Sequence, residues 1–413
     1  MPNAPRLESS LAIVLAALVV AACTPSSSNQ ARSSVPMPTP GEKIEAAKFS
    51  DSALAFTRRY CAEVLPETDV NSLVSPLSAQ LAFGMLAEGT AGTTQKELLG
   101  ALSSTSSATL TKEASAATRV LQEDGSLSIA NGLFWRTPPE ITSKYIGRLT
   151  SGYLAETAAL PEDNAAAVAL VNGWVKQKTR HMIPVLFESF KPDDRLVLVN
   201  AIAFEGKWQK EFEASQTRPT PFTNQKGEKD VPMMFAEMEL AYKSTPKFDV
   251  LHLGYVGQVY AMALLRFPKE ASPTAEIRKF ELKDWEAAML TGELVDVNLG
   301  LPKFKFSNTF DLQPPIQRLG AKKIFTRGDF TPMDPTDSLT NVSQAVQKTF
   351  IEVDESGTKA AAATGISVES KSAAPEPRQR IDFVLDRPFG FIIFHRESGL
   401  PVFIGTVDDP TAG

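Results

Sequence analysis

The sequence predicts an α+β protein built around a single large domain. Segments with helical periodicity lie mostly in the first half of the 413-residue chain, and short β-like segments lie mostly in the second half. The hydrophobic fraction of 43% and the charged fraction of 22% are those of a globular protein and exclude global disorder. No second linker-like stretch follows the first 43 residues, so we expect one domain over residues 44–413.

The N-terminus has the pattern of an export signal. Residues 11–22 are continuously apolar, but twelve residues are too few to cross a bilayer core of about 30 Å. We therefore interpret residues 1–22 as a signal peptide. The sequence Val-Ala-Ala-Cys that ends at Cys23 resembles a bacterial lipobox, which predicts cleavage before Cys23 and lipidation of its thiol. The alternative is an ordinary signal peptide with an incidental cysteine.

A tether is expected to join the lipid to the domain. Residues 23–43 are rich in serine and proline and have no apolar period. We therefore expect an exported protein, anchored by lipid in the bacterial cell envelope on its periplasmic or cell-surface side, or extracellular. With Cys23 lipidated, only Cys61 remains, so no intramolecular disulfide is expected.

Three helices are indicated in the first half of the chain. Ser75, followed by a proline, is a good start signal for a helix over residues 77–87. Thr94 and Glu97 have the spacing of a capping box, which predicts that a second helix opens there. Residues 168–178 have the pattern of an amphipathic helix.

The β-like segments are short, and one of them is apolar on both faces. Residues 196–199 and 201–204 are nearly all apolar, with Asn200 between them, which indicates a strand buried on both sides. Other β-like segments cover residues 127–130, 297–301, 303–306, 350–353, 381–385, 391–394 and 402–404.

Composition and motifs argue against several functional classes. The net charge is −6, so there is no basic surplus for nucleic acid. His181, His252 and His395 have no metal-ligand spacing, and the chain lacks the GxSxG, GxGxxG and P-loop motifs. We expect no metal, no cofactor and no nucleic-acid partner. A lipoprotein hydrolase with a dispersed Ser–His–Asp triad is the alternative from the enzyme class.

Residues 352–380 form an unusually long connection between two predicted strands. The simpler interpretation is a flexible loop in which four alanines form a turn of helix. Read with a period of two, however, residues 358–371 place small or β-branched side chains on one face and every charge on the other. Such a segment is a strand by pattern and a loop by position. Its 14 residues would span roughly 46 Å at about 3.3 Å each.

The chain resembles the serpin family over residues 44–410. The segment Glu355-x-Gly357-Thr358-x-Ala360-Ala361-Ala362-Ala363-Thr364 is similar to the proximal hinge of inhibitory serpins. Further similar motifs are Asn200-Ala201-Ile202, Phe204-x-Gly206-Lys207-Trp208, Val231-Pro232-Met233-Met234, Leu301-Pro302-Lys303-Phe304, Arg387-Pro388-Phe389 and Phe403-x-Gly405-x-Val407-x-x-Pro410.

The resemblance implies a fold and a mechanism. The serpin fold has a large mixed sheet A, smaller sheets B and C, about nine helices and an exposed reactive-centre loop, here about residues 355–380. The target protease attacks this loop and forms an acyl-enzyme, and the cut loop then inserts into sheet A as a new strand. The trap requires a metastable native state. We expect a monomer that forms a covalent complex with its target.

The resemblance also implies the bond that is cut. The family's hinge glutamate lies sixteen residues before the scissile residue, so 355 + 16 gives the bond Lys371–Ser372. A lysine there suits a trypsin-like protease with an acidic specificity pocket. Arg378 and Arg380 are the competing basic sites.

Four further residues match positions that the family uses to control loop insertion: Ser75, Ser78 and Asn200 in the shutter beneath the opening sheet, and Trp208 at the breach where the loop enters. At a shutter position where the family often has a histidine, this chain has Gln347. We expect Gln347 to bridge the hydroxyls and Asn200 without titrating. Gly365 on the inserting segment lowers its strand propensity. The alternative function is a non-inhibitory serpin that acts as a binding protein or a plain substrate.

Overall fold

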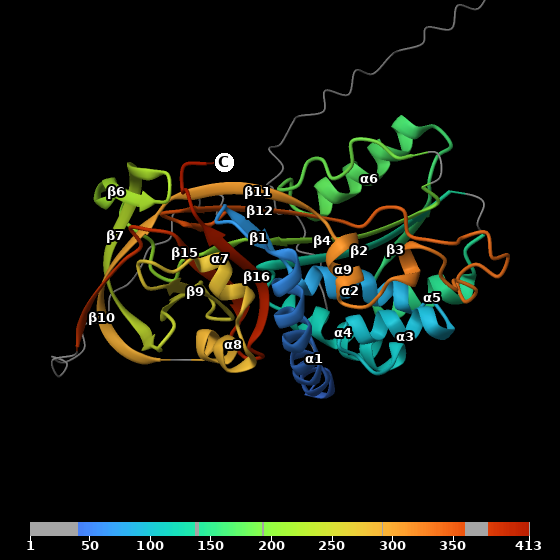
Figure 1. Cartoon of the computed structure of the whole chain (residues 1–413), viewed down its shortest axis with the longest axis horizontal. Coiled ribbons are helices and arrows are strands. Elements are labelled where there is room, and N and C mark those ends of the chain that lie inside the picture. The colour runs from blue at the N-terminus through green and yellow to red at the C-terminus, as the bar shows by residue number, and fades with distance from the viewer. Residues whose placement is uncertain (1–39, 137–139, 192–193, 291, 360–378, 413) are drawn as a thin grey trace, which may run out of the picture. The chain divides into compact units, whose positions relative to one another are not determined.

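The computed structural model describes residues 40–136, 140–191, 194–290, 292–359 and 379–412 (Figure 1). The predicted signal peptide, Cys23 and most of the tether lie outside these residues. The first helix begins at Pro40, four residues before the predicted start of the domain. Among the described residues, no helix is both long enough and apolar enough to span a membrane.

The described part of the chain contains nine α-helices and sixteen strands. The helices are α1 (Pro40–Val64), α2 (Pro76–Ala87), α3 (Gly92–Ala101), α4 (Ser107–Leu121), α5 (Ser143–Gly152), α6 (Asn164–Lys178), α7 (Pro273–Arg278), α8 (Leu282–Met289) and α9 (Gln313–Arg318). The strands are β1 (Ser72–Val74), β2 (Leu127–Trp135), β3 (Glu156–Ala159), β4 (Leu196–Phe204), β5 (Gly206–Lys207), β6 (Arg218–Asn224), β7 (Gly227–Ser244), β8 (Asp249–Gly254), β9 (Tyr260–Arg266), β10 (Glu293–Pro302), β11 (Phe304–Asp311), β12 (Val346–Asp354), β13 (Gly357–Thr358), β14 (Arg380–Val384), β15 (Phe389–His395) and β16 (Leu400–Val407).

These strands form one large mixed sheet and two smaller sheets. The nine-stranded sheet has the order β1-β16-β15-β9-β8-β7-β10-β14, with β6 paired to β7. The others are β11-β12-β13-β5 and β3-β2-β4. The pair β10–β14 is parallel and its neighbours are antiparallel, so the large sheet is mixed. The predicted α+β class, with three sheets and about nine helices, is confirmed for the described residues.

The buried strand β4 explains how the domain's layers meet. Val197, Val199 and Ala201 pack in a cluster with α6, whereas Ile202 and Phe204 belong to the main core. Because side chains alternate along a strand, β4 has α6 on one face and α2 on the other (Figure 1). The apolar run in the sequence therefore predicted a two-faced strand correctly.

The start of α2 is confirmed, and the predicted capping box is wrong. Ser75 is the N-cap of α2, and its side-chain oxygen accepts from the Ser78 amide at 3.2 Å. By contrast, α3 begins at Gly92, two residues before Thr94. The Thr94 hydroxyl instead accepts from the Asp329 amide at 2.9 Å, and Glu97 accepts from the Lys322 and Lys323 amides. Both side chains therefore bind backbone amides of distant segments and do not cap the helix.

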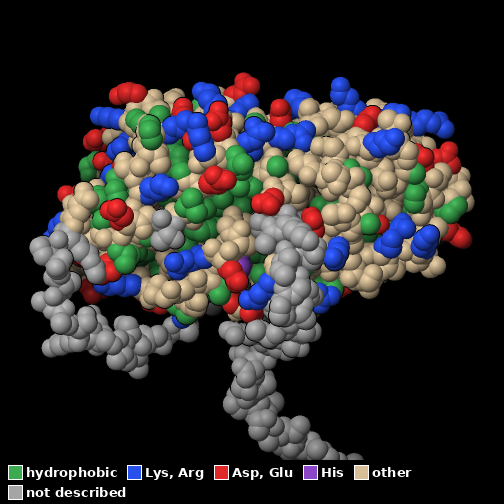
Figure 2. All heavy atoms as spheres, turned by 90° about the horizontal axis from the view of Figure 1, so that it is seen from below, with side chains coloured by type: hydrophobic (Ala, Val, Ile, Leu, Met, Phe, Trp, Pro, Cys, Tyr) green, Lys and Arg blue, Asp and Glu red, His purple; other side chains and the backbone are tan. Residues whose placement is uncertain are grey.

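The surface carries mixed charge. On the face shown in Figure 2, basic and acidic side chains are interspersed rather than gathered by sign. This distribution agrees with the small net charge of −6.

The buried thiol of Cys61 gives a test of the fold. Cys61 is 0% exposed on α1, and burial raises the pKa of its thiol well above the ordinary value. In a Cys23→Ser chain, we expect the thiol to react with Ellman's reagent at least about 1,000-fold more slowly in the native protein than in denaturant. Fast, stoichiometric labelling of the native protein would contradict the buried position of α1.

Candidate functional site

The chain approaches the site along β12. Its side chains alternate between half-buried and buried, and Gln347, Thr349, Ile351 and Val353 point inward. At the end of β12, the carboxylate of Asp354 accepts hydrogen bonds from the Ser356 amide at 2.9 Å and the Ser356 hydroxyl at 2.6 Å. This local pairing reverses the chain at the turn that the sequence predicted.

The reversed chain enters the sheet as the two-residue strand β13. Val353 pairs with Thr358 on one side, and Thr358 pairs with Gly206 of β5 on the other. The Lys359 amide continues the ladder to the Glu352 carbonyl at 2.8 Å. The start of the predicted strand at Thr358 is therefore confirmed. The remaining predicted residues of the loop, namely Ala360, Ala361, Ala362, Ala363, Thr364, Gly365, Lys371, Ser372 and Arg378, lie outside the described residues.

Thr358 is buried against an aromatic stack. It is 3% exposed, and its hydroxyl lies 2.7 Å from the hydroxyl of Tyr255. The Tyr255 ring stacks on Trp208 with centroids 4.7 Å apart and meets Phe204 edge-on at 4.8 Å. Burial raises the pKa of Tyr255 well above its ordinary value, so the phenol keeps its proton. The place beneath Thr358 is therefore filled and rigid.

Trp208 holds the turn from the other side. It is 1% exposed, and its indole Nε1 donates to the Asp354 carbonyl at 2.9 Å. Its backbone amide donates to the Ser356 carbonyl at 3.0 Å. The position that the resemblance assigned to the breach thus lies directly against the start of the loop.

Two glycines allow the backbones of β13 and β5 to approach each other. A Cβ atom on Gly357, whose φ is +156°, would lie 2.1 Å from the Gly206 carbonyl oxygen. A Cβ atom on Gly206 would lie 2.7 Å from the Tyr255 ring. Both distances are too short for a carbon atom, and neither the backbone nor the packed ring can move far enough to relieve the clash. Both positions therefore require glycine.

Glu355 fixes the outside of the turn. Its carboxylate accepts from Lys303 Nζ at 2.7 Å and from the Thr217 hydroxyl at 2.8 Å, and its carbonyl accepts from the Phe212 amide at 2.9 Å. Burial alone would raise the pKa of the Glu355 carboxyl, but the bonds from Lys303 and Thr217 outweigh burial and lower it. Sequence reasoning missed Thr217 and Phe212, and it gave Lys303 no role although Lys303 stands in a quoted motif.

The predicted shutter residues fall on two sides of a gap. On the β12 side, the Gln347 amide donates to the Ser75 carbonyl at 2.8 Å and accepts from the Ser75 amide at 3.0 Å. The Tyr60 hydroxyl also donates to Gln347, at 3.4 Å, and the Ser75 hydroxyl donates to the Val402 carbonyl at 2.8 Å. Gln347 therefore clamps the start of α2.

Asn200 lies on the β4 side and has different partners. Its Nδ2 donates to Asn131 at 2.6 Å, and Asn131 in turn donates to the Tyr153 carbonyl at 2.6 Å. Its Oδ1 is buried and has no hydrogen-bond partner in the structure. The predicted bridge from Gln347 to Asn200 is wrong, because each amide is already engaged with its own side of the gap.

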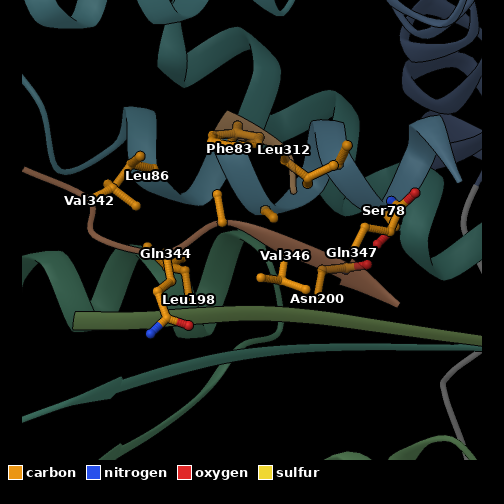
Figure 3. Close-up of a pocket in the computed structure, with 13 residues that line it drawn as sticks. Ser78, Phe83, Leu86, Leu198, Asn200, Leu312, Val342, Gln344, Val346 and Gln347 are labelled. Atoms are coloured by element: carbon orange, nitrogen blue, oxygen red, sulfur yellow. The ribbon is translucent and has the colours of Figure 1, made fainter. Parts of the chain in front are cut away.

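A cavity lies between β4 and β12. We use the name opening for the whole space that has β12 on one side and β4, followed by β5, on the other. Figure 3 shows side chains of both strands and of α2 around the cavity. The space measures about 450 Å³, part of it open solvent. Its lining includes Ser78, Phe83 and Leu86 of α2, Leu198 and Asn200 of β4, and Val346 and Gln347 of β12. No described strand continues the sheet position of β13 beside these residues.

Comparisons with known proteins agree with this geometry. The family model described as "Serpin (serine protease inhibitor)" matches residues 51–410. The chain is 33% identical to a leukocyte elastase inhibitor of Sus scrofa over 359 residues, which cover 82% of this chain and 93% of that protein. It is 31% identical to Iripin-8 of Ixodes ricinus over 365 residues, with 83% and 89% covered.

Solved structures show the same fold. The native state of the thermophilic serpin tengpin superposes with a TM-score of 0.76 at 27% identity, covering 88% of this chain and 94% of that chain. Its latent state superposes with a TM-score of 0.74 at 27% identity, covering 88% and 98%. The family model and the relatives both span most of the chain. This chain therefore belongs to the serpin family.

Proposed function

We propose that this serpin inhibits trypsin-like serine proteases as a suicide substrate. The protease's serine attacks the Lys371 carbonyl, the amide bond to Ser372 breaks, and the new amine end leaves while Lys371 stays bound as an ester. The loop then enters the opening as a strand and carries the protease with it. Family membership supports inhibition, and the described hinge supports insertion.

The observation that carries the proposal is the placement of β13 between β12 and β5. Val353 pairs with Thr358 and Asp354 with Gly357, so each step along the loop moves one residue back along β12. In the proposed inserted strand, the same register would bring Thr364 opposite Gln347. Counting from the pair Thr358–Gly206 would bring Thr364 opposite Asn200 as well.

This register gives the unpaired amide oxygen a partner. The buried Oδ1 of Asn200 has none in the present structure, and a threonine hydroxyl can donate to it. The small side chains that share the Thr358 face would fill the cavity against α2. Both changes stabilise the inserted state relative to the present one.

The backbone contributes in the same direction. One edge of β12 pairs with β11 along its length. On the other edge, among the described residues, only Val353 and Asp354 pair with β13, and the part from Val346 to Ile351 has no described strand beside it. Each ladder hydrogen bond gained contributes about 0.5–1.5 kcal/mol. A strand that filled the opening would therefore stabilise the cut form by several bonds at once.

The described structure also bears on the competing cleavage sites. Arg380 begins β14, where it pairs with Asp296 of β10 and forms an ion pair with Glu237. A protease needs its substrate extended and free of a sheet, which disfavours Arg380. Between Lys371 and Arg378, the family's spacing favours Lys371.

We further propose that lipid on Cys23 tethers the inhibitor to the bacterial envelope as a monomer. The apolar run of residues 11–22 and the lipobox-like end at Cys23 support this location. A protease that reached the cell would then meet the loop at the membrane surface.

Substitution of Thr358 tests whether the loop inserts. In Thr358→Arg, a charged side chain replaces one that is 3% exposed and packed on Tyr255, so residue 358 is expected to leave the sheet. Insertion, which starts from β13, is then expected to stall. Trypsin should then cut the variant without forming the complex that survives a denaturing gel, and the inhibitor needed per protease should rise at least tenfold. Lys359→Arg is the matched control, since Lys359 Nζ lies over the Phe350 ring, 5.1 Å from its centroid, and arginine can keep that contact.

The outcomes separate the two functions of a serpin. Trapping is supported if the wild type and Lys359→Arg form the complex with trypsin and Thr358→Arg does not. Clean cleavage of the wild type, with no complex and no rise in its melting temperature, would contradict trapping and favour the non-inhibitory alternative.

Substitution of Lys371 tests the reactive bond. Lys371→Ala leaves the acidic pocket of a trypsin-like protease without its partner, so the rate of complex formation should fall at least about 30-fold. Arg378→Ala is the control and should change the rate less than twofold. Mass spectrometry of the cleaved protein should place the cut after Lys371, and a cut after Arg378 would show that the register is wrong.

Substitution of Cys23 tests the anchor. The wild-type chain is expected to partition into the membrane fraction and the detergent phase, and Cys23→Ser into the soluble fraction, because the acyl chains supply the membrane affinity. Equal partitioning of both proteins would contradict lipidation and favour an ordinary signal peptide.

A further inference from the structure

The connection between α6 and β4 packs on the three-stranded sheet β3-β2-β4 and contacts β12. We call it the strap and define it as residues 179–195, of which 192 and 193 are outside the described residues. Its upper end is fixed by Arg180, whose guanidinium donates to Glu205 at 3.0 Å and to the Gly125 carbonyl. Glu205 separates β4 from β5, so the strap starts beside the upper part of the opening.

The lower end of the strap is joined to the segment that leads into β12. Asp194 is 2% exposed and lies two residues before β4. Its Oδ1 accepts from the Ser343 hydroxyl, and its Oδ2 accepts from Gln344 Nε2 at 2.6 Å and from the Lys191 amide at 2.7 Å. Two of these three donors precede β12, so one carboxylate connects the starts of both strands that border the opening.

A second contact ties the strap to β12. Lys348 Nζ donates to the Val185 carbonyl at 2.7 Å. This contact is exposed to solvent, whereas Asp194 is buried, so the Asp194 contacts are the stronger link.

We infer that Asp194 acts as a clasp that closes the lower end of the opening and limits the rate at which a strand can pass the cavity. This inference rests on the proposed strand insertion. A strand between β12 and β4 would set them about 9.5 Å apart, twice the spacing of neighbouring strands. A serine hydroxyl cannot reach a carboxylate across that distance, so the bond from Ser343 to Asp194 must break.

The chemistry of the clasp makes its release cooperative. A buried carboxylate needs its donors, and losing Ser343 and Gln344 together leaves Asp194 with only the Lys191 amide among its present partners. Once one donor is released, the remaining hydrogen bond to Asp194 stabilises the carboxylate more, because fewer partners are left. The two bonds therefore form or break together, and the lower end is either closed or fully open. The clasp is a positioning device and touches neither protease nor scissile bond.

The test uses the full chain and a synthetic peptide with the sequence of residues 360–371, AAAATGISVESK, which leaves β13 in its place. Its uptake is followed by native mass spectrometry and by the rise in melting temperature. Ser343→Ala and Gln344→Ala each remove one bond to Asp194 and leave the bond from the Lys191 amide to Asp194 in place. Each variant should take up the peptide about tenfold faster than the wild type, the factor that corresponds to one lost bond to a charged group.

Ser338→Ala is the matched control. The Ser338 hydroxyl also donates to a buried carboxylate, that of Asp334, at 2.8 Å. The donors to the Asp334 carboxylate all lie within five residues of it, so these bonds join neither of the strands that border the opening. The uptake rate of this variant should stay within twofold of the wild type. Equal rates in all four proteins, or equal acceleration in Ser338→Ala, would overturn the clasp and leave strand insertion standing. Uptake by none of them would overturn strand insertion, and the clasp with it.

Discussion

The pairing of Gly357 and Thr358 with β12 and β5 is the interaction on which the rest of the site depends. It places two residues in a sheet position that continues, unfilled by any described strand, past the cavity. A strand edge with free donors and acceptors is a template for another strand. The pairing thus fixes both the direction and the register in which the following residues can add to the sheet.

The contacts around β13 make this starting point immobile. Trp208 and the Asp354 carboxylate bind the turn through its backbone, and Glu355 binds Lys303 and Thr217 on the outside. The turn is therefore held to the rest of the fold on all these sides. In the proposed mechanism, this fixed hinge would direct the cut loop into the opening instead of letting the whole segment come away.

Local signals predicted the parts that depend on neighbouring residues. The Ser75 cap, the two-faced strand β4 and the turn before Gly357 are written within a few residues of sequence. Contacts between distant segments were not predictable in this way. No local pattern joins Lys303 to Glu355, and none shows that Thr94 would serve Asp329 instead of a helix end or that Gln347 would bind Ser75 instead of Asn200. Residues 52 to 272 positions apart make these contacts, and only the fold brings them together.

The opening is closed at its upper end by β13 and at its lower end by Asp194. Two features that cost stability lie between these ends. An unpaired buried amide oxygen such as that of Asn200 costs about 1–3 kcal/mol, and an apolar cavity forgoes packing contacts. Both lie at the level where an inserted strand would bring a hydroxyl and small side chains. A sequence under selection for stability alone would pair Asn200 and fill the cavity. In the proposed mechanism, keeping both features in the uncut state would lower its stability relative to the inserted state, and this difference would supply free energy for trapping the protease.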